Sequence, residues 1–226
     1  MNENEKIINQ EDYCIGDPKS FVYFDTEFTG LRKDTTLISI GLVDFSGRSF
    51  YAEFNDYDKN QVNKWIEENV IKNLRVLPQD GASDIVEGYD DEYFMRGSKS
   101  DISIALLRWL QPIIDDGKKI QFVSDVSHYD FVLLIDLLLD DPNSTAMDLP
   151  KGISPTCIDI NQDIAMHVFV SPDNTKGRTT NDIAFDMDRE KALSSMGLEV
   201  PEGDKHNSLY DAKVIRMIHQ HLWNLK

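Results

Sequence analysis

The sequence predicts an α/β fold, a mixed sheet with helices on its faces. Three runs of β-branched and aromatic residues come first, and helical periodicity then alternates with short apolar runs, without an internal repeat or a low-complexity tract. The chain has 226 residues, 41% of them hydrophobic, which is enough for one substantial core. We therefore expect a polar leader over residues 1–18 and a single domain over residues 19–226.

The three early runs predict three strands. The first begins at Phe21 with four aromatic or β-branched residues in a row, which is typical of a strand buried on both faces. The second is predicted for residues 36–45 and the third for residues 48–54, after a short Ser-Gly turn. Connections this short predict that the three strands are antiparallel neighbours.

Helices and short strands are predicted to alternate after the third strand. Apolar residues at helical spacing, beginning with Trp65 and Ile66, predict an amphipathic helix over residues 63–74. Residues 78–99 are acidic and rich in glycine, and we expect a surface loop there, with a lid or an interface as alternatives. The remaining predictions are helices from Ser100 or Asp101 to 114 and over 129–139, 162–169, 189–196 and 209–225, strands over 120–123 and 156–159, and a loop over 171–186.

Charge and cysteine content limit the class of protein. The chain has 23 Lys and Arg against 40 Asp and Glu residues, a net charge of −17, so it lacks the basic surface of a protein that wraps nucleic acid. A small site that meets phosphate through bound cations is still compatible with this charge. The two cysteines, Cys14 and Cys157, make no disulfide framework and indicate a cytoplasmic protein. No apolar run predicts a signal peptide or a membrane span.

Two carboxylates end the first predicted strand, just before a Thr-Gly break. Asp25 and Glu27 are two residues apart, so both side chains leave a strand on the same face. Two anions held this close repel each other, and a shared proton or a divalent cation such as Mg²⁺ or Mn²⁺ relieves the repulsion. The alternative is that the two acids only mark where the strand leaves the core.

Two further acids and a histidine lie at predicted helix starts. Asp130 is the one acid in the first turn of an apolar helix, where it either has a functional role or only offsets the helix dipole. Asp125, at the preceding strand end, is the rival, and we favour Asp130 because the helix start holds it rigidly. Asp211, three residues after Ser208, has the spacing of a capping box, whereas a functional role places it beside His206, a histidine before the helix that can act as a general base.

Taken in order, Asp25, Glu27, Asp130, His206 and Asp211 resemble the motifs of the DEDDh-type 3'-5' exonucleases of the ribonuclease H-like superfamily. The matching segments are residues 24–31, 128–131 and 206–212, so the resemblance covers nearly the whole chain. The second motif departs from the pattern, because many relatives have Asn where this chain has Val126. Residues 63–74 are similar to small stand-alone bacterial exoribonucleases, which favours RNA over DNA.

The resemblance implies a mixed five-stranded sheet with an antiparallel second strand, and removal of nucleotides from a 3' end. It implies that Asp25 bridges two Mg²⁺ or Mn²⁺ ions, that Glu27 and Asp211 hold the ion beside the attacking water, and that Asp130 holds the other. It also implies that His206 takes the proton of that water. The substrate-binding residues that it implies are an apolar wedge at Leu31 and a pocket for the 3' nucleotide at Thr26 and Phe28.

Three alternatives for the function and one expectation for the assembly follow. The leading hypothesis is a metal-dependent 3'-5' exonuclease that acts on the 3' end of single-stranded RNA. A DNA-trimming or proofreading exonuclease would use the same chemistry, and the 2'-hydroxyl preference separates the two. A non-catalytic interaction module on the same fold belongs to another class. Many relatives are dimers, so the resemblance also implies a homodimer as one assembly.

Overall fold

The computed structural model describes residues 17–75, 86–89, 91–139, 141, 143–167 and 177–224. The predicted leader lies outside these ranges, except for Asp17 and Pro18. The Asp17 side chain accepts from the backbone N–H of Lys19 and caps a short 3₁₀ helix, η2 (Pro18–Ser20), that leads into the first strand. The division into a leader and one domain stays a prediction.

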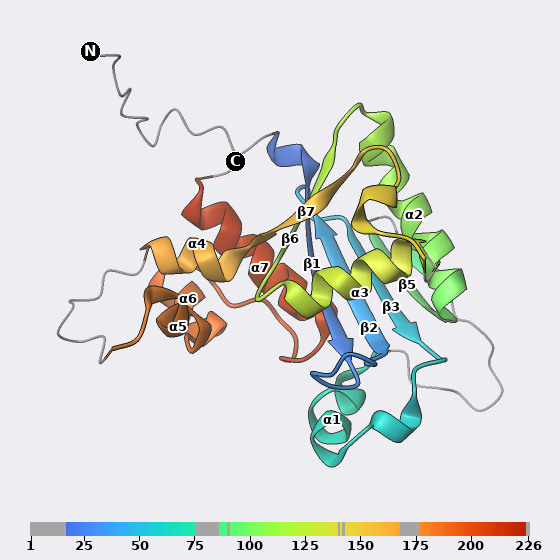
Figure 1. Ribbon diagram of the computed structural model, residues 1–226. Helices are drawn as coiled ribbons and strands as arrows, with labels where there is room; N and C mark the ends of the chain where they lie inside the picture. The colour runs from blue at the N-terminus through green and yellow to red at the C-terminus, as the bar shows by residue number, and fades with distance from the viewer. Residues whose placement is uncertain are drawn as a thin grey trace, which may run out of the picture.

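Seven strands of the described chain form one sheet, in the order β4-β5-β3-β2-β1-β6-β7 (Figure 1). The pairs β1–β2 and β2–β3 are antiparallel, whereas β6 runs parallel to β1 and β7 parallel to β6. This confirms the mixed sheet with an antiparallel second strand. The strands are β1 (Phe21–Phe28), β2 (Leu37–Asp44), β3 (Ser49–Phe54), β4 (Val86–Tyr89), β5 (Glu92–Gly97), β6 (Ile120–Ser124) and β7 (Ile153–Asp159).

The two strands beyond the expected five correct the loop prediction for residues 78–99. Strands β4 and β5 pair antiparallel with each other, and β5 pairs in parallel with β3. The physical reason is the free edge of β3, whose backbone N–H and C=O groups would otherwise lack partners in the sheet. Tyr93 also stacks on Phe50, with ring centroids 5.1 Å apart. Residues 78–85 and 90 of the predicted loop lie outside the described residues.

Helices cover both faces of the sheet (Figure 1). The alternation of side chains along β1 explains the two layers. Val22 and Phe24 pack in one core with α2 (Lys99–Asp115) and α3 (His128–Leu139). Phe21 and Tyr23 pack in another core with α4 (Ile160–His167), α6 (Arg189–Ser195) and α7 (Ser208–Leu222). No helix of the described ranges is long and apolar enough to cross a membrane. The helices are α1 (Lys64–Asn69), α2 (Lys99–Asp115), α3 (His128–Leu139), α4 (Ile160–His167), α5 (Thr180–Phe185), α6 (Arg189–Ser195) and α7 (Ser208–Leu222).

Several predictions about the helices differ from the structure. The loop predicted for residues 171–186 contains α5, which begins with a capping box between Thr179 and Asp182. Residues 168–176, which include the end of the helix predicted over 162–169 and the start of this loop, lie outside the described residues. Helix α2 is capped by Ser98 rather than by Ser100 or Asp101. The helix predicted over residues 63–74 is α1 followed by a 3₁₀ turn, η4 (Ile71–Asn73).

A glycine in β2 lets α7 approach the sheet. Gly41 lies opposite Asp25 in the β1–β2 ladder, and a Cβ added at Gly41 would come within 2.3 Å of the backbone nitrogen of Leu209. The hydroxyl groups of Ser39 and Ser208, 3.0 Å apart, join the same two elements. The absence of a side chain at Gly41 therefore places the first turn of α7 directly beside the acidic end of β1.

Candidate active site

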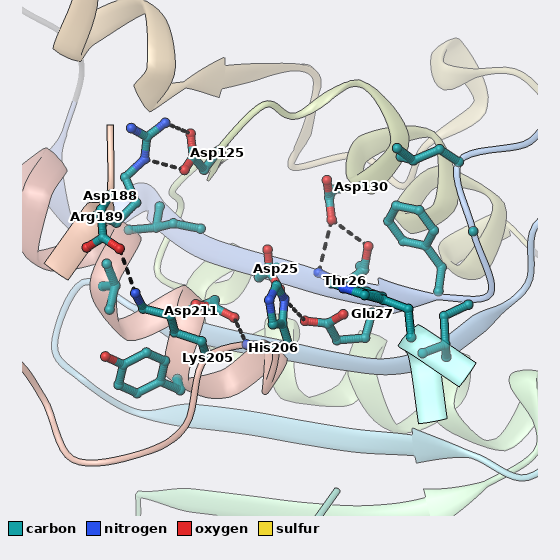
Figure 2. Close-up of a pocket in the computed structure, with 18 of the residues that line it drawn as sticks. Asp25, Thr26, Glu27, Asp125, Asp130, Asp188, Arg189, Lys205, His206 and Asp211 are labelled. Atoms are coloured by element: carbon teal, nitrogen blue, oxygen red, sulfur yellow. Dashed lines mark hydrogen bonds and ion pairs between the residues drawn. The ribbon is translucent and has the colours of Figure 1, made fainter. Parts of the chain in front are cut away.

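A cavity of about 740 Å³ opens beside the end of β1, next to α1 and the starts of α6 and α7 (Figure 2). Residues from β1, from the β6–α3 turn and from the start of α7 meet there, although they are far apart in the sequence. The cavity is lined by every residue that the sequence singled out: Asp25, Thr26, Glu27, Phe28, Leu31, Asp130, His206 and Asp211. The fold thus brings the whole predicted set to one place.

Three partly buried carboxylates form the centre of the cavity. Asp25 and Glu27 leave β1 on the same face, and Asp211 faces them from the first turn of α7. One carboxylate oxygen of each residue lies within 4.8 Å of the corresponding oxygens of the other two. Hard oxygen donors at this spacing are the ligands that Mg²⁺ and Mn²⁺ prefer.

The three acids repel one another. Burial, with the charges of nearby acids, raises the pKa of Asp25 and of Glu27 well above the usual range. Burial raises the pKa of Asp211 to about 7. Each group therefore favours a proton or a cation over the bare carboxylate, so the residues present fit a divalent metal ion.

Asp130 is held against β1 by Thr26. Its Oδ1 accepts hydrogen bonds from the Thr26 backbone N–H at 3.0 Å and from the Thr26 hydroxyl at 2.5 Å. The residue is 7% exposed, and burial raises the pKa of its carboxyl group to about 6 against the opposing effect of these hydrogen bonds. The charge of Asp130 in turn raises the pKa of both Asp25 and Glu27, so it belongs to the same electrostatic group.

Asp125, the rival of Asp130, is paired with an arginine. Its two carboxylate oxygens accept from Arg189 Nε at 2.6 Å and from Arg189 Nη2 at 2.7 Å. Figure 2 shows the Asp125 side chain turned toward Arg189, whereas Asp130 points to Thr26. The structure therefore separates two acids that the sequence left as alternatives for one position.

His206 lies in the turn before α7, as predicted. Its backbone φ is +61°, a left-handed conformation, and its N–H donates to Asp211 Oδ2 at 2.9 Å. Its Nδ1 is 3.9 Å from Glu27 Oε1, and its ring meets Trp65 edge to face, with centroids 5.1 Å apart. Burial, and then the charge of Lys205, lowers the pKa of the imidazole. The ring is therefore neutral near pH 7 and able to accept a proton.

The capping box that the spacing of Ser208 and Asp211 left as an alternative is not formed. Asn207 is the N-cap of α7, and its side chain accepts from the backbone N–H of Tyr210. Asp211 instead accepts from the backbone of His206. The physical reason is that Asn207 caps one residue earlier, which leaves the Asp211 side chain in the cavity.

Apolar side chains lie exposed at the edge of the cavity. Leu31 is 79% exposed and Trp65 is 54% exposed, so both offer open surface to a ligand. Phe28 stacks on Tyr129, with ring centroids 5.6 Å apart. Thr26 also lines the cavity, although its hydroxyl donates to Asp130.

Sequence reasoning missed three other residues of this cavity. Trp65 was expected only as an apolar position of a helix, and exposure is not visible in periodicity. Arg189 pairs with Asp125, and Lys205 pairs with Asp188 at 2.7 Å and with Glu190 at 3.2 Å. A signal was present for Lys205, which directly precedes the predicted base, but none pointed to Arg189.

Comparison with known proteins gives one family. The family model described as "3'-5' exoribonuclease Rv2179c-like domain" matches residues 20–223, nearly the full length of the chain. No curated protein matches the chain.

Several solved structures are similar at low identity. S. pombe Pop2p, in a form with Mg²⁺ and Mn²⁺ bound, is 14% identical, with a TM-score of 0.48 over 89% of this chain and 81% of that one. A chain in the structure of the yeast NOT1 MIF4G domain co-crystallized with CAF1 is 13% identical, with a TM-score of 0.46 over 89% and 79%. The Neurospora crassa Pan2 catalytic unit, with protease and nuclease domains, is 13% identical, with a TM-score of 0.47 over 98% of this chain and 30% of that one.

Proposed function

Because the chain belongs to the Rv2179c-like 3'-5' exoribonuclease domain family and is thus a 3'-5' exonuclease, we propose that it shortens single-stranded RNA from the 3' end. The products would be nucleoside 5'-monophosphates. The observation that carries the proposal is the meeting of Asp25, Glu27 and Asp211, whose carboxylate oxygens lie within 4.8 Å of one another in a cavity shared with His206.

The four acids of the cavity would hold two Mg²⁺ or Mn²⁺ ions. We assign Asp25 to the position between the ions, Glu27 and Asp211 to the ion on the side of the attacking water, and Asp130 to the other. Bound in this way, such an ion pair supplies an activated water and neutralises charge on the phosphodiester. The raised pKa of each acid supports the assignment, since a cation relieves the repulsion that raises it.

His206 would accept the proton of the attacking water. The neutral imidazole is half-exposed at the cavity, next to Glu27 and Asp211. Its backbone hydrogen bond to Asp211 links its position to that of one acid, while Trp65 limits the movement of the ring. A positioned base of this kind typically contributes about 10²–10⁴-fold to a rate.

Leu31, Phe28 and Trp65 would contact the nucleotides at the 3' end. Stacking on the rings of Phe28 and Trp65 and apolar contact with Leu31 would tolerate any base, which suits a degradative enzyme. A net charge of −17 gives the protein no general attraction to phosphate, so we expect affinity to come from this local site. The preference for RNA would depend on contacts to the 2'-hydroxyl.

Matched RNA and DNA oligonucleotides, each labelled at the 5' or the 3' end, test the proposal. With Mn²⁺, we expect a ladder that shortens stepwise from 5'-labelled RNA and immediate release of labelled mononucleotide from 3'-labelled RNA. Chelator should stop both, and Asp211→Asn, purified in parallel, serves as the control for contaminating nucleases. Faster cleavage of DNA would favour the DNA-trimming alternative, and cleavage that persists in chelator would contradict the metal assignment.

Two expectations accompany this function. A homodimer would give twice the mass of one chain in sedimentation equilibrium, and a monomer would contradict it. The cytoplasmic location indicated by the cysteine content also stays a prediction, which cell fractionation can check.

A further inference from the structure

A fifth carboxylate lines the cavity that holds the four proposed metal ligands. Asp125 directly follows β6, and its charge contributes to raising the pKa of Asp25, Asp130 and Asp211. An acid this close to a cation site is a competing ligand unless something else binds it.

Arg189 binds both carboxylate oxygens of Asp125. Its Nε and Nη2 take the two oxygens of Asp125, at 2.6 and 2.7 Å, and this fork geometry is the strongest form of ion pair. The same guanidinium donates from Nη1 to the carbonyl oxygens of Ala184 and Met187 at 2.6 and 3.1 Å, and from Nη2 to Asn161 Oδ1 at 3.2 Å. Both charged side chains are largely buried, at 16% and 19% exposure, so the pair is rigid.

The backbone next to Asp125 is held separately. The N–H groups of Val126 and Ser127 donate to the two oxygens of Asp159, at 3.0 and 3.1 Å. Val126 adopts a φ of +50°, which is strained for a β-branched residue. Because Asp159 holds the turn, loss of Arg189 should free the Asp125 side chain without releasing the turn that leads to α3 and Asp130.

We propose that Arg189 is a positioning residue that binds Asp125 and keeps this fifth carboxylate away from the metal ions held by Asp25, Glu27, Asp130 and Asp211. The inference rests on the proposed function of that site. In Figure 2 the two side chains face each other on one side of the cavity, with the other acids beyond them. Arginine suits this role, because it stays charged at all relevant pH values and its planar fork matches a carboxylate.

The test compares Arg189→Gln, Asp125→Asn and the double variant. Arg189→Gln frees a charged carboxylate beside the site, so we expect Mn²⁺ to bind about tenfold more tightly in calorimetry while kcat falls about 10–100-fold. Asp125→Asn removes the competing carboxylate but leaves the Arg189 charge unpaired beside the site, so we expect weaker Mn²⁺ binding than in the wild type, with little change in kcat at saturating Mn²⁺. The double variant should have a kcat at least tenfold higher than that of Arg189→Gln, and its Mn²⁺ affinity should equal that of the wild type. Arg189→Lys keeps the charge without the fork and should lie between wild type and Arg189→Gln.

Arg48→Gln is the matched control for lost packing. Arg48 also pairs with an acid, Asp44 at 3.0 Å, and donates to the Trp109 carbonyl, but it does not line the cavity. We expect it to lower the stability to urea without changing Mn²⁺ affinity. A double variant as slow as Arg189→Gln, or unchanged Mn²⁺ affinity in Arg189→Gln, would overturn the inference. Failure of the wild type to bind Mn²⁺ would instead overturn the proposed function.

Discussion

Asp25 lies directly across the β1–β2 ladder from Gly41, and the backbone of Leu209 occupies the space where a side chain at Gly41 would project. Strand β1 supplies Asp25, and α7 packs against the sheet where Gly41 leaves space. The two elements therefore meet at the Asp25–Gly41 pair.

Gly41→Ala should displace the start of α7. The added Cβ would lie 2.3 Å from the Leu209 nitrogen, and backbone cannot move aside as a flexible side chain can. We expect a loss of stability of about 1–3 kcal/mol, as for overpacking, and weaker Mn²⁺ binding in calorimetry because Asp211 moves with the helix. Ile38→Val, in the same strand, should cost about 1 kcal/mol and leave Mn²⁺ affinity intact. Equal Mn²⁺ affinity in the two variants would contradict the prediction.

Asp211→Asn should separate activity from stability. The amide cannot serve as a charged metal ligand, so we expect kcat to fall by at least about 10³-fold, or about 4 kcal/mol of barrier. The same change removes one of several repelling charges, so the metal-free protein should resist urea better at pH 8. Asp136→Asn, which removes a surface acid paired with Lys99, should leave kcat unchanged. A destabilised Asp211→Asn would argue against repulsion in the cavity.

Metal-free protein should lose stability as pH rises. The folded-state pKa values of Asp130 and Asp211, about 6 and about 7, lie above the usual value of 3.8, so the folded state binds more protons than the unfolded state in this range. The stabilisation is fully present below about pH 4 and is lost as pH rises through about 7. In chelator, the urea midpoint should therefore fall between pH 5 and pH 8, and Mn²⁺ should restore it at pH 8. A midpoint that rises over this range would refute the assignment.

His206→Ala should slow turnover while metal binding persists. The imidazole is proposed to accept a proton, whereas the backbone N–H that donates to Asp211 is present in any variant. We expect kcat to fall about 10²–10⁴-fold with Mn²⁺ affinity within about twofold of the wild type. Rapid-quench kinetics over pH 5–9 give the pH profile of the cleavage rate. In the wild type the rate should fall at acidic pH as His206 is protonated, and this acidic limb should be absent in His206→Ala. If the limb persists, another group is the base, and His128 at the start of α3 is the next candidate.

Leu31→Ala should weaken substrate binding without destabilising the fold. The side chain is 79% exposed, so its removal leaves no cavity in a core. We expect KM for a short RNA to rise several-fold with kcat nearly constant, because the variant loses the apolar contact between the leucine side chain and a base, at about 25 cal/mol per Å² of apolar surface. Met147→Ala, at a residue that is 82% exposed outside the cavity, is the control for general surface effects. An unchanged KM would remove Leu31 from the substrate site.

Much of this fold and cavity follows from local patterns in the sequence. The side-chain period of two explains why Asp25 and Glu27 share a face, and it also explains the two cores on either side of β1. Asp130 and Asp211 lie in the first turns of helices. The onset of helical spacing of apolar residues predicts such positions from the sequence. These are short-range relationships, and short-range relationships can be predicted from one sequence.

Other features depend on contacts between distant segments. Strand β5 forms because the edge of β3 is available for pairing. The glycine-rich stretch itself contains no local pattern that predicts this pairing. The pairing of Asp125 with Arg189 joins residues 64 positions apart, so the sequence alone could not separate Asp125 from Asp130. The cap at Asn207 was missed because Ser208 and Asp211 have capping-box spacing, and only the three-dimensional structure shows that Asp211 faces the cavity.

Val126 and His206 each hold a left-handed backbone conformation just before the helix that carries Asp130 or Asp211. Such a conformation costs about 1–2 kcal/mol for a residue with a side chain, and glycine would adopt it at little cost. A laboratory search for heat-resistant variants should therefore find Val126→Gly early, with a higher melting temperature. Glycine at His206 would relieve the same strain but would also remove the proposed base, so durability and speed would oppose each other at that turn.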